Sequence, residues 1–111
     1  MIKGIGIDMV EISRFKKATK RWKNTFLKRV FTDQEIEYSM QKRFPYQHLA
    51  ARFAAKEAVM KAFGDTVITF KEIEIVNDRF GKPTCKLRKK KDNIHLSITH
   101  TDKYAIATAV I

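Results

Sequence analysis

The chain has 111 residues, 44% of them hydrophobic, and a formal charge of +11 at pH 7; this length fits one domain, residues 1–111, with a modest core. No apolar run reaches the roughly 18 residues of a membrane-spanning helix, and the start lacks a signal peptide's apolar block, so we expect a cytoplasmic protein with no membrane partner. The positive charge indicates an anionic partner, which composition leaves open among nucleic acid, an acidic protein and a phosphorylated small molecule.

The opening segment predicts a β-strand with two unlike faces. Apolar residues alternate with glycine or aspartate over residues 4–9, and a period of two is typical of a strand. One face carries Ile5, Ile7 and Met9, and the other carries Asp8 beside bare glycines. Bare glycines allow a close approach to the backbone.

A basic helix is predicted next, in a stretch between Ile12 and Phe31 that contains no acidic residue. Ser13 is a candidate helix cap. An apolar stripe at helical spacing should face inward; it consists of Phe15, Ala18, Trp22 and Phe26. Another face carries Arg14, Lys17 and Arg21. The simplest interpretation of such a charge run is a solvated face.

Two further helices are predicted in the middle of the chain. Thr32 and Glu35 form a capping box that opens a helix, which should end before Pro45. The next helix, about Tyr46 to Phe63, is rich in alanine. Gly64 is its natural terminator.

Strands dominate the second half. Alternation in residues 72–75 predicts one strand, and further strands are expected at Thr84–Leu87, Ile94–Ile98 and Tyr104–Ile111. The predicted class is therefore α+β, with an N-terminal strand, central helices and a C-terminal antiparallel β-meander in a single compact domain. Cys85 is the only cysteine, so no intrachain disulfide can form and we expect a small buried hydrophobe there.

Asp8 and Glu57 are the candidate metal ligands. The spacing of Glu57 and Lys61 alone favours an ordinary ion pair along a helix, and a strand aspartate is usually exposed or a cap acceptor. The combination of both acids with glycine-flanked backbone and nearby positive charge instead favours magnesium, which commonly takes one or two carboxylates together with a substrate phosphate.

Other chemical motifs are weak. The sequence has no GxxxxGK loop and no CxxC, and its three histidines do not have the spacing of zinc ligands. His100 follows hydroxyl residues at a strand end, where it could contact an anion or satisfy a turn carbonyl. Both readings stay open.

Five segments match one family in order: GIGIDMVEISR at residues 4–14, VFTDQE at 30–35, LAARFAAKEAVMK at 49–61, GKP at 81–83 and SITHT at 97–101. On these motifs the chain resembles the holo-acyl-carrier-protein synthases, small bacterial 4′-phosphopantetheinyl transferases. The resemblance implies transfer of 4′-phosphopantetheine from coenzyme A to a serine of apo acyl carrier protein, with release of adenosine 3′,5′-bisphosphate, in support of fatty acid biosynthesis. It also implies the 4′-phosphopantetheinyl transferase fold, Mg²⁺, a homotrimer and active sites between subunits.

The resemblance also assigns residues. Asp8 and Glu57 would bind magnesium and Lys61 would contact the phosphates, as the catalytic set. The coenzyme A pocket would be lined by Arg52, Lys56, Gly81, Lys82, Pro83, Ser97, His100 and Thr101. The acidic carrier protein would dock at Arg14, Lys17 and Arg21. The acceptor of the serine proton, Glu57 or a metal-bound water, stays open. The segment between Gly64 and Phe70 is shorter than usual in the family, so a loop over the phosphates is expected to be altered.

Two rival functions remain at this point. A basic RNA-binding module would suit the charge, but the predicted strands lack the solvent-face aromatics that stack bases, and we expect no nucleic acid partner. A non-catalytic protein that binds coenzyme A or a carrier protein is the second rival. The intact Asp8, Glu57 and Lys61 argue against it, and magnesium-dependent transfer would exclude it.

Overall fold

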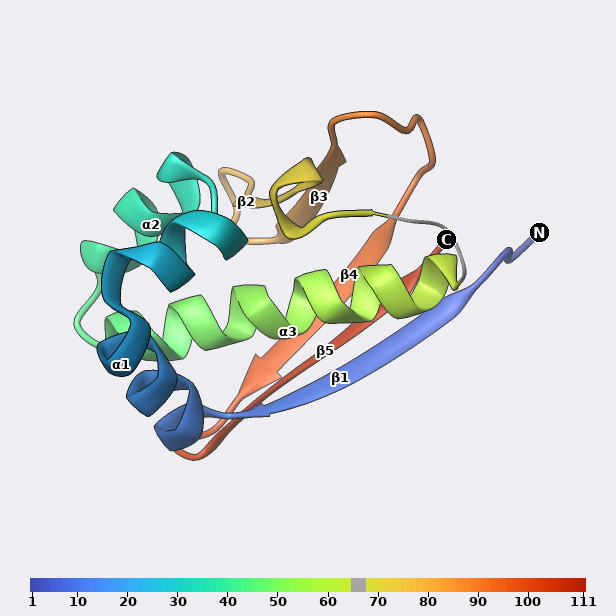
Figure 1. Cartoon of the computed structure of the whole chain (residues 1–111). Helices are drawn as coiled ribbons and strands as arrows, with labels where there is room; N and C mark the ends of the chain where they lie inside the picture. Colours follow the sequence, from blue (N-terminus) through green and yellow to red (C-terminus); the bar gives the residue numbers. More distant parts are fainter. Residues whose placement is uncertain (65–67) are drawn as a thin grey trace.

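The computed structural model describes residues 1–64 and 68–111. Its elements are strand β1 (Ile5–Glu11), helices α1 (Ile12–Val30), α2 (Asp33–Met40) and α3 (Pro45–Phe63), the 3-10 helix η1 (Phe70–Glu72), and strands β2 (Ile73–Asn77), β3 (Pro83–Leu87), β4 (His95–His100) and β5 (Tyr104–Val110). Helix α3 lies along a three-stranded sheet, with the β2–β3 hairpin on the other side of the helix (Figure 1).

The predicted α+β class is confirmed, with antiparallel pairing throughout. The strand order in the larger sheet is β1-β5-β4, and β2 and β3 form a separate two-stranded sheet. The C-terminal strands, expected as one meander, are thus two hairpins in two sheets. Within the described ranges, no helix is long and apolar enough to cross a membrane.

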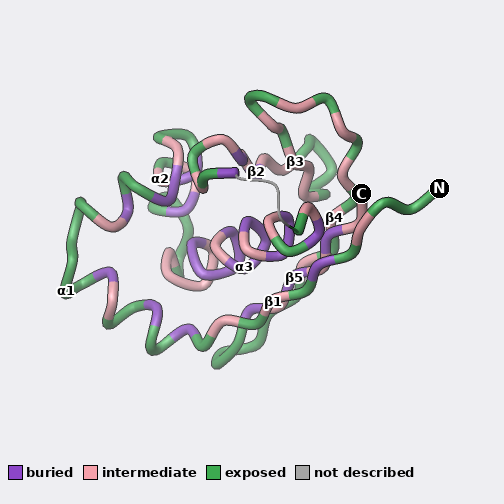
Figure 2. The backbone as a smooth tube through the Cα atoms, turned by 45° about the vertical axis from the view of Figure 1, so that its right-hand side comes forward, coloured by how far each residue is buried: buried purple, intermediate pink, exposed green. Residues whose placement is uncertain are grey.

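Helix α3 packs directly on the glycine face of β1. A Cβ built on Gly6 would overlap the carbonyl oxygen of Ala58, and one on Gly4 would overlap that of Ala62. Small side chains on both elements allow this approach, since α3 is rich in buried alanine (Figure 2). The close approach expected at the glycines is therefore made by the chain's own helix.

The opposite face of this sheet is open. Ile5, Ile7 and Met9 are 62%, 59% and 62% exposed. The register places them across from Val110, Thr108 and Ile106 of β5. We call this surface the open sheet face; in the part of the chain that the structure describes, no element covers it. The apolar side of β1 is thus the exposed side, and its bare side is the buried one.

Helix α1 departs from the predicted straight amphipathic helix. Its N-cap is Glu11 and not Ser13, whose hydroxyl donates to the Glu11 carboxylate at 2.9 Å. Lys23 has φ 51° and ψ −139°, which breaks the helix into two segments. Phe15 is buried as predicted, whereas Trp22 is 59% exposed. The prediction for Trp22 was wrong because the break directly after it interrupts the stripe on which it lies.

The capping box at the start of α2 is confirmed, and it extends into a buried ion pair. Glu35 accepts the backbone N–H of Thr32 at 2.8 Å and the ammonium of Lys56 at 2.6 Å. Lys56 also donates to the carbonyl oxygens of Val30 at 2.7 Å and Phe70 at 3.0 Å. This one ammonium ties α3 to the end of α1, to α2 and to η1.

The remaining boundaries follow local rules. Helix α2 ends at Met40, ahead of Pro45, which begins α3. Gly64 ends α3 with φ 69°, and its N–H is bonded to Met60 and Lys61 carbonyl oxygens.

Burial raises the pKa of Cys85 to about 12, so the thiol stays protonated and unreactive, in line with its interpretation as a small hydrophobe.

Candidate active site

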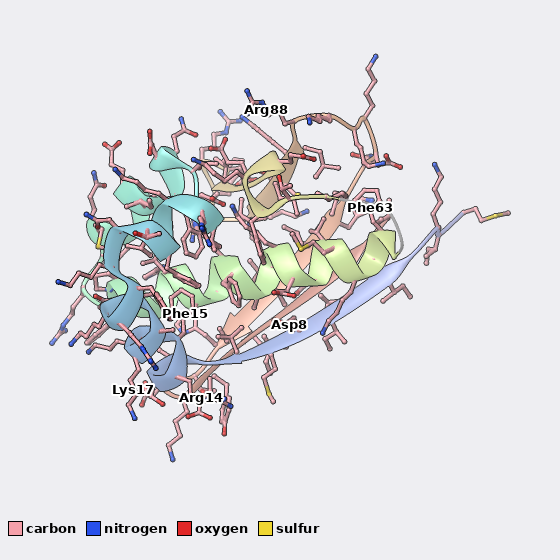
Figure 3. The ribbon with its side chains drawn as sticks, viewed as in Figure 1. Asp8, Arg14, Phe15, Lys17, Phe63 and Arg88 are labelled. Atoms are coloured by element: carbon pink, nitrogen blue, oxygen red, sulfur yellow. The ribbon has the colours of Figure 1, made fainter. Side chains whose placement is uncertain are left out.

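Strand β1 and helix α3 bring together Asp8, Glu57 and Lys61. The Nζ atom of Lys61 lies 3.0 Å from Asp8 Oδ1 and 3.1 Å from the carbonyl oxygen of Ile7. Helical spacing alone favours an ion pair between Lys61 and Glu57, one turn earlier. In the structure, Lys61 pairs instead with the strand residue Asp8. The Asp8 side chain is 16% exposed and that of Lys61 54%. Figure 3 shows Asp8 on β1 beside α3.

The pKa of Glu57 is raised by its surroundings in this group. Burial raises its pKa above 4.5, the neighbouring charge of Asp8 raises it further, and Lys61 acts in the opposite direction. Two acids held close enough to repel one another are relieved by a divalent cation. In the described ranges, no three or more His, Cys, Asp or Glu side chains are grouped so that together they could hold a metal ion. Two carboxylates, with water and phosphate oxygens completing the shell, fit magnesium.

In the metal-free protein, Glu57 is expected to titrate above 4.5, the ordinary value. Its carboxyl must lose the proton to bind a cation, so magnesium affinity should fall as the pH decreases through this raised pKa. Asp8→Asn should lower the pKa of Glu57, and Lys61→Met should raise it. NMR titration of ¹³C-labelled side-chain carboxyls measures the pKa of Glu57 in the unmodified protein and in both variants. An ordinary Glu57 pKa in all three proteins would contradict the placement of Glu57 beside Asp8 and Lys61.

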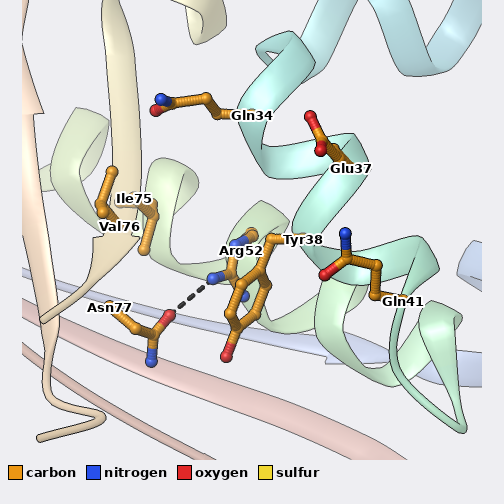
Figure 4. A pocket seen from close by; sticks show the side chains of 8 residues that line it. All are labelled: Gln34, Glu37, Tyr38, Gln41, Arg52, Ile75, Val76 and Asn77. Carbon is orange, nitrogen blue, oxygen red and sulfur yellow. Dashed lines mark hydrogen bonds between the residues drawn. The ribbon is translucent and has the colours of Figure 1, made fainter. Parts of the chain in front are cut away.

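A second group of predicted residues surrounds Arg52. Its guanidinium lies 4.2 Å from the ring centroid of Tyr38 and donates to Asn77 Oδ1 at 2.6 Å (Figure 4). Asn77 in turn donates to the carbonyl oxygen of Gly81 at 2.9 Å. Arg52 is 5% exposed, and its Nε has no hydrogen-bond partner among the residues described. Arg52 is thus a buried cation whose Nε–H donor has no acceptor among the described residues.

Arg52 lines a pocket of about 320 Å³ between α2 and β2 (Figure 4). The other lining residues are Gln34, Glu37, Tyr38, Gln41, Ile75, Val76 and Asn77. Asn77 tethers the turn that contains Gly81 to Arg52. Hydrogen bonds hold this turn: Asp78 Oδ1 accepts the N–H of Phe80 at 2.8 Å and of Lys82 at 2.9 Å. Gly81 has φ 85°, a conformation that favours glycine. Lys82 is exposed and Pro83 begins β3.

His100 lies at the end of β4, its ring centroid 6.2 Å from that of His48. Burial lowers the pKa of His48, and Arg52 and His100 lower it further. The three side chains therefore form one basic neighbourhood. No bond from His100 to a turn carbonyl is among the described contacts, which leaves the ring available to an anion.

Thr101 and Ser97, also predicted for the coenzyme A pocket, have other surroundings. The Thr101 hydroxyl oxygen accepts the N–H groups of Lys103 at 3.2 Å and Tyr104 at 3.1 Å, which fixes the β4–β5 turn. Ser97 pairs with Thr108 on the open sheet face. It lies on the opposite side of the sheet from His100.

Lys56 is the predicted pocket residue that the structure removes from the surface. Its side chain is 0% exposed and its three N–H donors all have protein acceptors, in Glu35, Val30 and Phe70. Burial lowers the pKa of Lys56, against the attraction of Glu35. Its place is structural, and contact with a ligand would require breaking a buried ion pair. The altered loop expected after Gly64 includes residues 65–67, which lie outside the described residues.

The predicted residues therefore form two separate groups. Asp8, Glu57 and Lys61 lie where α3 meets β1, whereas Arg52, His100 and the turn at 81–83 lie toward β2 and β4. Strands β1 and β4 are the two edges of the larger sheet. Figure 1 shows β1 and the β2–β3 hairpin on opposite sides of α3.

Sequence reasoning passed over two residues that hold Arg52 in place. Tyr38 stacks against the guanidinium and Asn77 links it to the turn. Asn77 is recognisable in the sequence only as a turn former. Tyr38 carries no motif, and its role depends on the packing of α2 against α3.

The predicted docking residues Arg14, Lys17 and Arg21 are all exposed on α1. Figure 3 shows Arg14 and Lys17 near the end of β1. A second basic stretch without an acidic residue runs from Arg79 to Lys91, and its Arg88 lies well away from Arg14 and Lys17 in the same view. The two basic regions are thus distinct surfaces.

Residues 4–109 match the family described as the 4′-phosphopantetheinyl transferase superfamily, and the chain belongs to this family. The holo-[acyl-carrier-protein] synthase of Thermodesulfovibrio yellowstonii is 44% identical, over 100% of this chain and 99% of its own length. The enzyme of the same name from Chloroherpeton thalassium is 43% identical, over 96% and 95%.

Solved structures agree. The holo-(acyl-carrier-protein) synthase of Bacillus anthracis in complex with CoA (3′,5′-ADP) has a TM-score of 0.87 at 36% identity, covering 99% of this chain and 96% of its own. The Helicobacter pylori synthase in complex with coenzyme A has a TM-score of 0.85 at 33% identity, covering 95% and 96%. The resemblance and the fold are thereby confirmed, and the chain is an enzyme of the phosphopantetheinyl transferase class.

Proposed function

We propose that this chain transfers 4′-phosphopantetheine from coenzyme A to a serine of apo acyl carrier protein, in a magnesium-dependent reaction that supplies fatty acid biosynthesis in the cytoplasm. The observation that carries the proposal is the convergence of Asp8, Glu57 and Lys61 from two distant segments of a chain in this family. The relatives solved with coenzyme A support the choice of donor, since they match this chain over nearly its full length.

In the proposed reaction, the serine oxygen bonds to the β-phosphorus of coenzyme A, and the bond from that phosphorus to the bridging oxygen breaks. The electron pair leaves with adenosine 3′,5′-bisphosphate. Asp8 and Glu57 would hold magnesium, which when bound neutralises charge on the phosphoryl oxygens. Lys61 donates to Asp8 and Ile7 and keeps one N–H for the leaving group. With this N–H it stabilises the negative charge of the leaving oxygen or protonates that oxygen. The serine proton passes to Glu57 or to water.

For the coenzyme A pocket, we propose Arg52, Lys82 and His100 as the contacts, with Gly81 and Pro83 shaping the turn. Arg52 has an unpartnered donor in the described contacts, and Lys82 and His100 are exposed. Cations suit the phosphates of coenzyme A. Thr101 would contribute to the coenzyme A pocket indirectly, by fixing the β4–β5 turn. Ser97 would contribute to it from the open sheet face.

We further propose that the two groups of site residues meet between copies of the chain in a homotrimer. One chain holds them on opposite sides of α3, so a second copy is needed to complete the site. The open sheet face supports association, because monomeric proteins rarely leave a contiguous apolar surface uncovered. The number three is taken from the family resemblance.

Substituting Ile5→Lys on the open sheet face should weaken association, since it places a charge where Ile5 is 62% exposed and apolar. Sedimentation of the unmodified protein should give three times the 13.0 kDa chain mass, and the variant should give less, with a parallel loss of transfer. A wild-type monomer at high concentration would rule out a site shared between copies.

The proposed reaction is tested by intact mass spectrometry of an apo acyl carrier protein incubated with this protein and coenzyme A. With magnesium, the carrier should gain one phosphopantetheine group. Chelator, or the Asp8→Ala variant, should abolish the gain. An unchanged mass with a carrier protein from the same cell would contradict the proposal and favour a binding-only protein.

A further inference from the structure

His48 lies in the first turn of α3, directly before the motif at residues 49–61, and sequence analysis gave it no role. Its ring packs edge-on against Tyr38 of α2, with 6.1 Å between the ring centroids. It packs in the same way against His100 of β4, at 6.2 Å. The half-buried imidazole of His48 thus lies where α2, α3 and β4 meet, beside the proposed coenzyme A pocket.

The charged groups nearest to His48 are basic. Arg52 follows it by one turn on α3, a spacing that makes two side chains neighbours on a helix, and its guanidinium lies 4.2 Å from the ring centroid of Tyr38. The ammonium of Lys42, which follows α2, lies 4.5 Å from the same centroid. His100 adds a second imidazole from β4. Two permanent cations and two imidazoles therefore share one neighbourhood.

Acidic groups on the neighbouring elements do little to offset this charge. Glu35 of α2 is engaged in the buried ion pair described above. Glu37 of α2, which lines the pocket of Figure 4, and Asp102 of the β4–β5 turn are both exposed to solvent. From α1, Lys16 adds a further basic group at this end of α3, 5.4 Å from the ring centroid of Tyr46.

These surroundings disfavour a proton on His48 in the free protein. Burial lowers the pKa of His48 most, and Arg52, His100 and Lys42 lower it further, so the ring is neutral at pH 7. A phosphate bound here would act in the opposite direction, because a negative charge nearby favours the protonated form. Two features favour such an anion: the positive end of the α3 dipole and the buried Nε–H of Arg52, which has no acceptor among the described residues.

We infer that His48 is a further residue of the coenzyme A pocket, which takes up a proton when a phosphate group of coenzyme A binds beside His100. This inference rests on the proposed function, which supplies the donor. The linkage is reciprocal, so the protonated ring also binds the phosphate more tightly, through a charge-assisted hydrogen bond. The gain in affinity is complete below the pKa of His48 in the free protein and is lost above its pKa in the complex. Coenzyme A should therefore bind more tightly as the pH falls.

The direct test is an NMR titration of the unmodified enzyme with ¹³C-labelled histidine. The sequence has three histidines, and the variant His48→Gln identifies the signal of His48. Without ligand, His48 should titrate below 6.5. With coenzyme A bound, it should titrate at least about one pH unit higher than without it. Bound coenzyme A that leaves the pKa of His48 unchanged would overturn the inference.

Calorimetric titration with coenzyme A at about pH 6 and about pH 8 tests the effect on affinity. The Kd of His48→Gln should be within about twofold of the Kd of the unmodified enzyme at the higher pH, and about fivefold weaker at the lower pH. The phosphates of coenzyme A titrate with both proteins, so the ratio of the two Kd values removes their contribution. A ratio that does not change with pH would count against proton uptake by His48.

His95→Gln is the matched control, because it makes the same chemical change at the other end of β4 from His100, where His95 is exposed. It should leave the Kd for coenzyme A unchanged at both pH values. Failure of the proposed function gives a different result from failure of the inference. An unmodified enzyme that modifies the carrier without any response of His48 overturns the inference alone. An unmodified protein that neither binds coenzyme A nor modifies the carrier overturns the proposed function, and the inference with it.

Discussion

Replacing Glu57 with glutamine is expected to lower kcat/KM for carrier modification by about 100-fold or more. The amide removes one of the two carboxylates that we propose as magnesium ligands, and magnesium binds neutral amides less well than carboxylates. Folding should be unaffected, because Glu57 is only half-buried and its raised pKa shows that its charge is disfavoured there. Intact mass of the carrier measures the activity, and thermal unfolding measures the fold.

Glu72→Gln is the control for this substitution. Glu72 is also half-buried and lies 3.6 Å from the ammonium of Lys89, so the chemical change and its surroundings are similar. It has no place in the proposed site and should retain full activity. An active Glu57→Gln enzyme at limiting magnesium would show that the metal-ligand assignment is wrong.

Gly6→Ala is expected to destabilise the protein by about 3 kcal/mol or more, and to leave little folded chain. The new methyl group would overlap backbone atoms of Ala58 and Ala62, which cannot rotate away as a side chain can. Relief would require moving β1 off α3, and with it Asp8 away from Glu57. Urea unfolding, followed by circular dichroism, measures the change.

Gly64→Ala separates this clash from the general effect of losing a glycine. Among the described residues, a Cβ on Gly64 meets nothing within 4 Å, and strain comes from φ +69°. The expected loss is about 1 kcal/mol. A Gly6→Ala protein that unfolds at the same urea concentration as the parent would mean that β1 does not pack on α3 as described.

Local chemistry made much of the fold predictable. The capping box at Thr32 and Glu35, the terminator Gly64 and the alternation in residues 4–9 depend on neighbours in the sequence, and all appear in the structure. The partnership of Asp8 with Glu57 could be proposed because both acids have unusual settings, but their proximity required the close approach of β1 to α3.

The failures depended on distant contacts. Alternation in β1 indicates two faces but not which one is buried, and here the glycines are covered while Ile7 is 59% exposed. The break at Lys23 has no glycine or proline to mark it, so the position of Trp22 could not be predicted from helical spacing. Lys56 reads as a surface charge until Glu35 is placed against it by the packing of α2 on α3.

The division of the site across α3 also bears on the symmetry of assembly. A contact that brings the Asp8 side of one copy to the Arg52 side of another joins unlike surfaces, and such heterologous contacts either close into rings or continue as filaments. Two copies joined this way complete a single site and leave an unmatched half at each end. A closed ring completes one site for every chain. Full catalytic capacity per chain would therefore belong to the cyclic assembly, and the chemistry itself would select against a dimer.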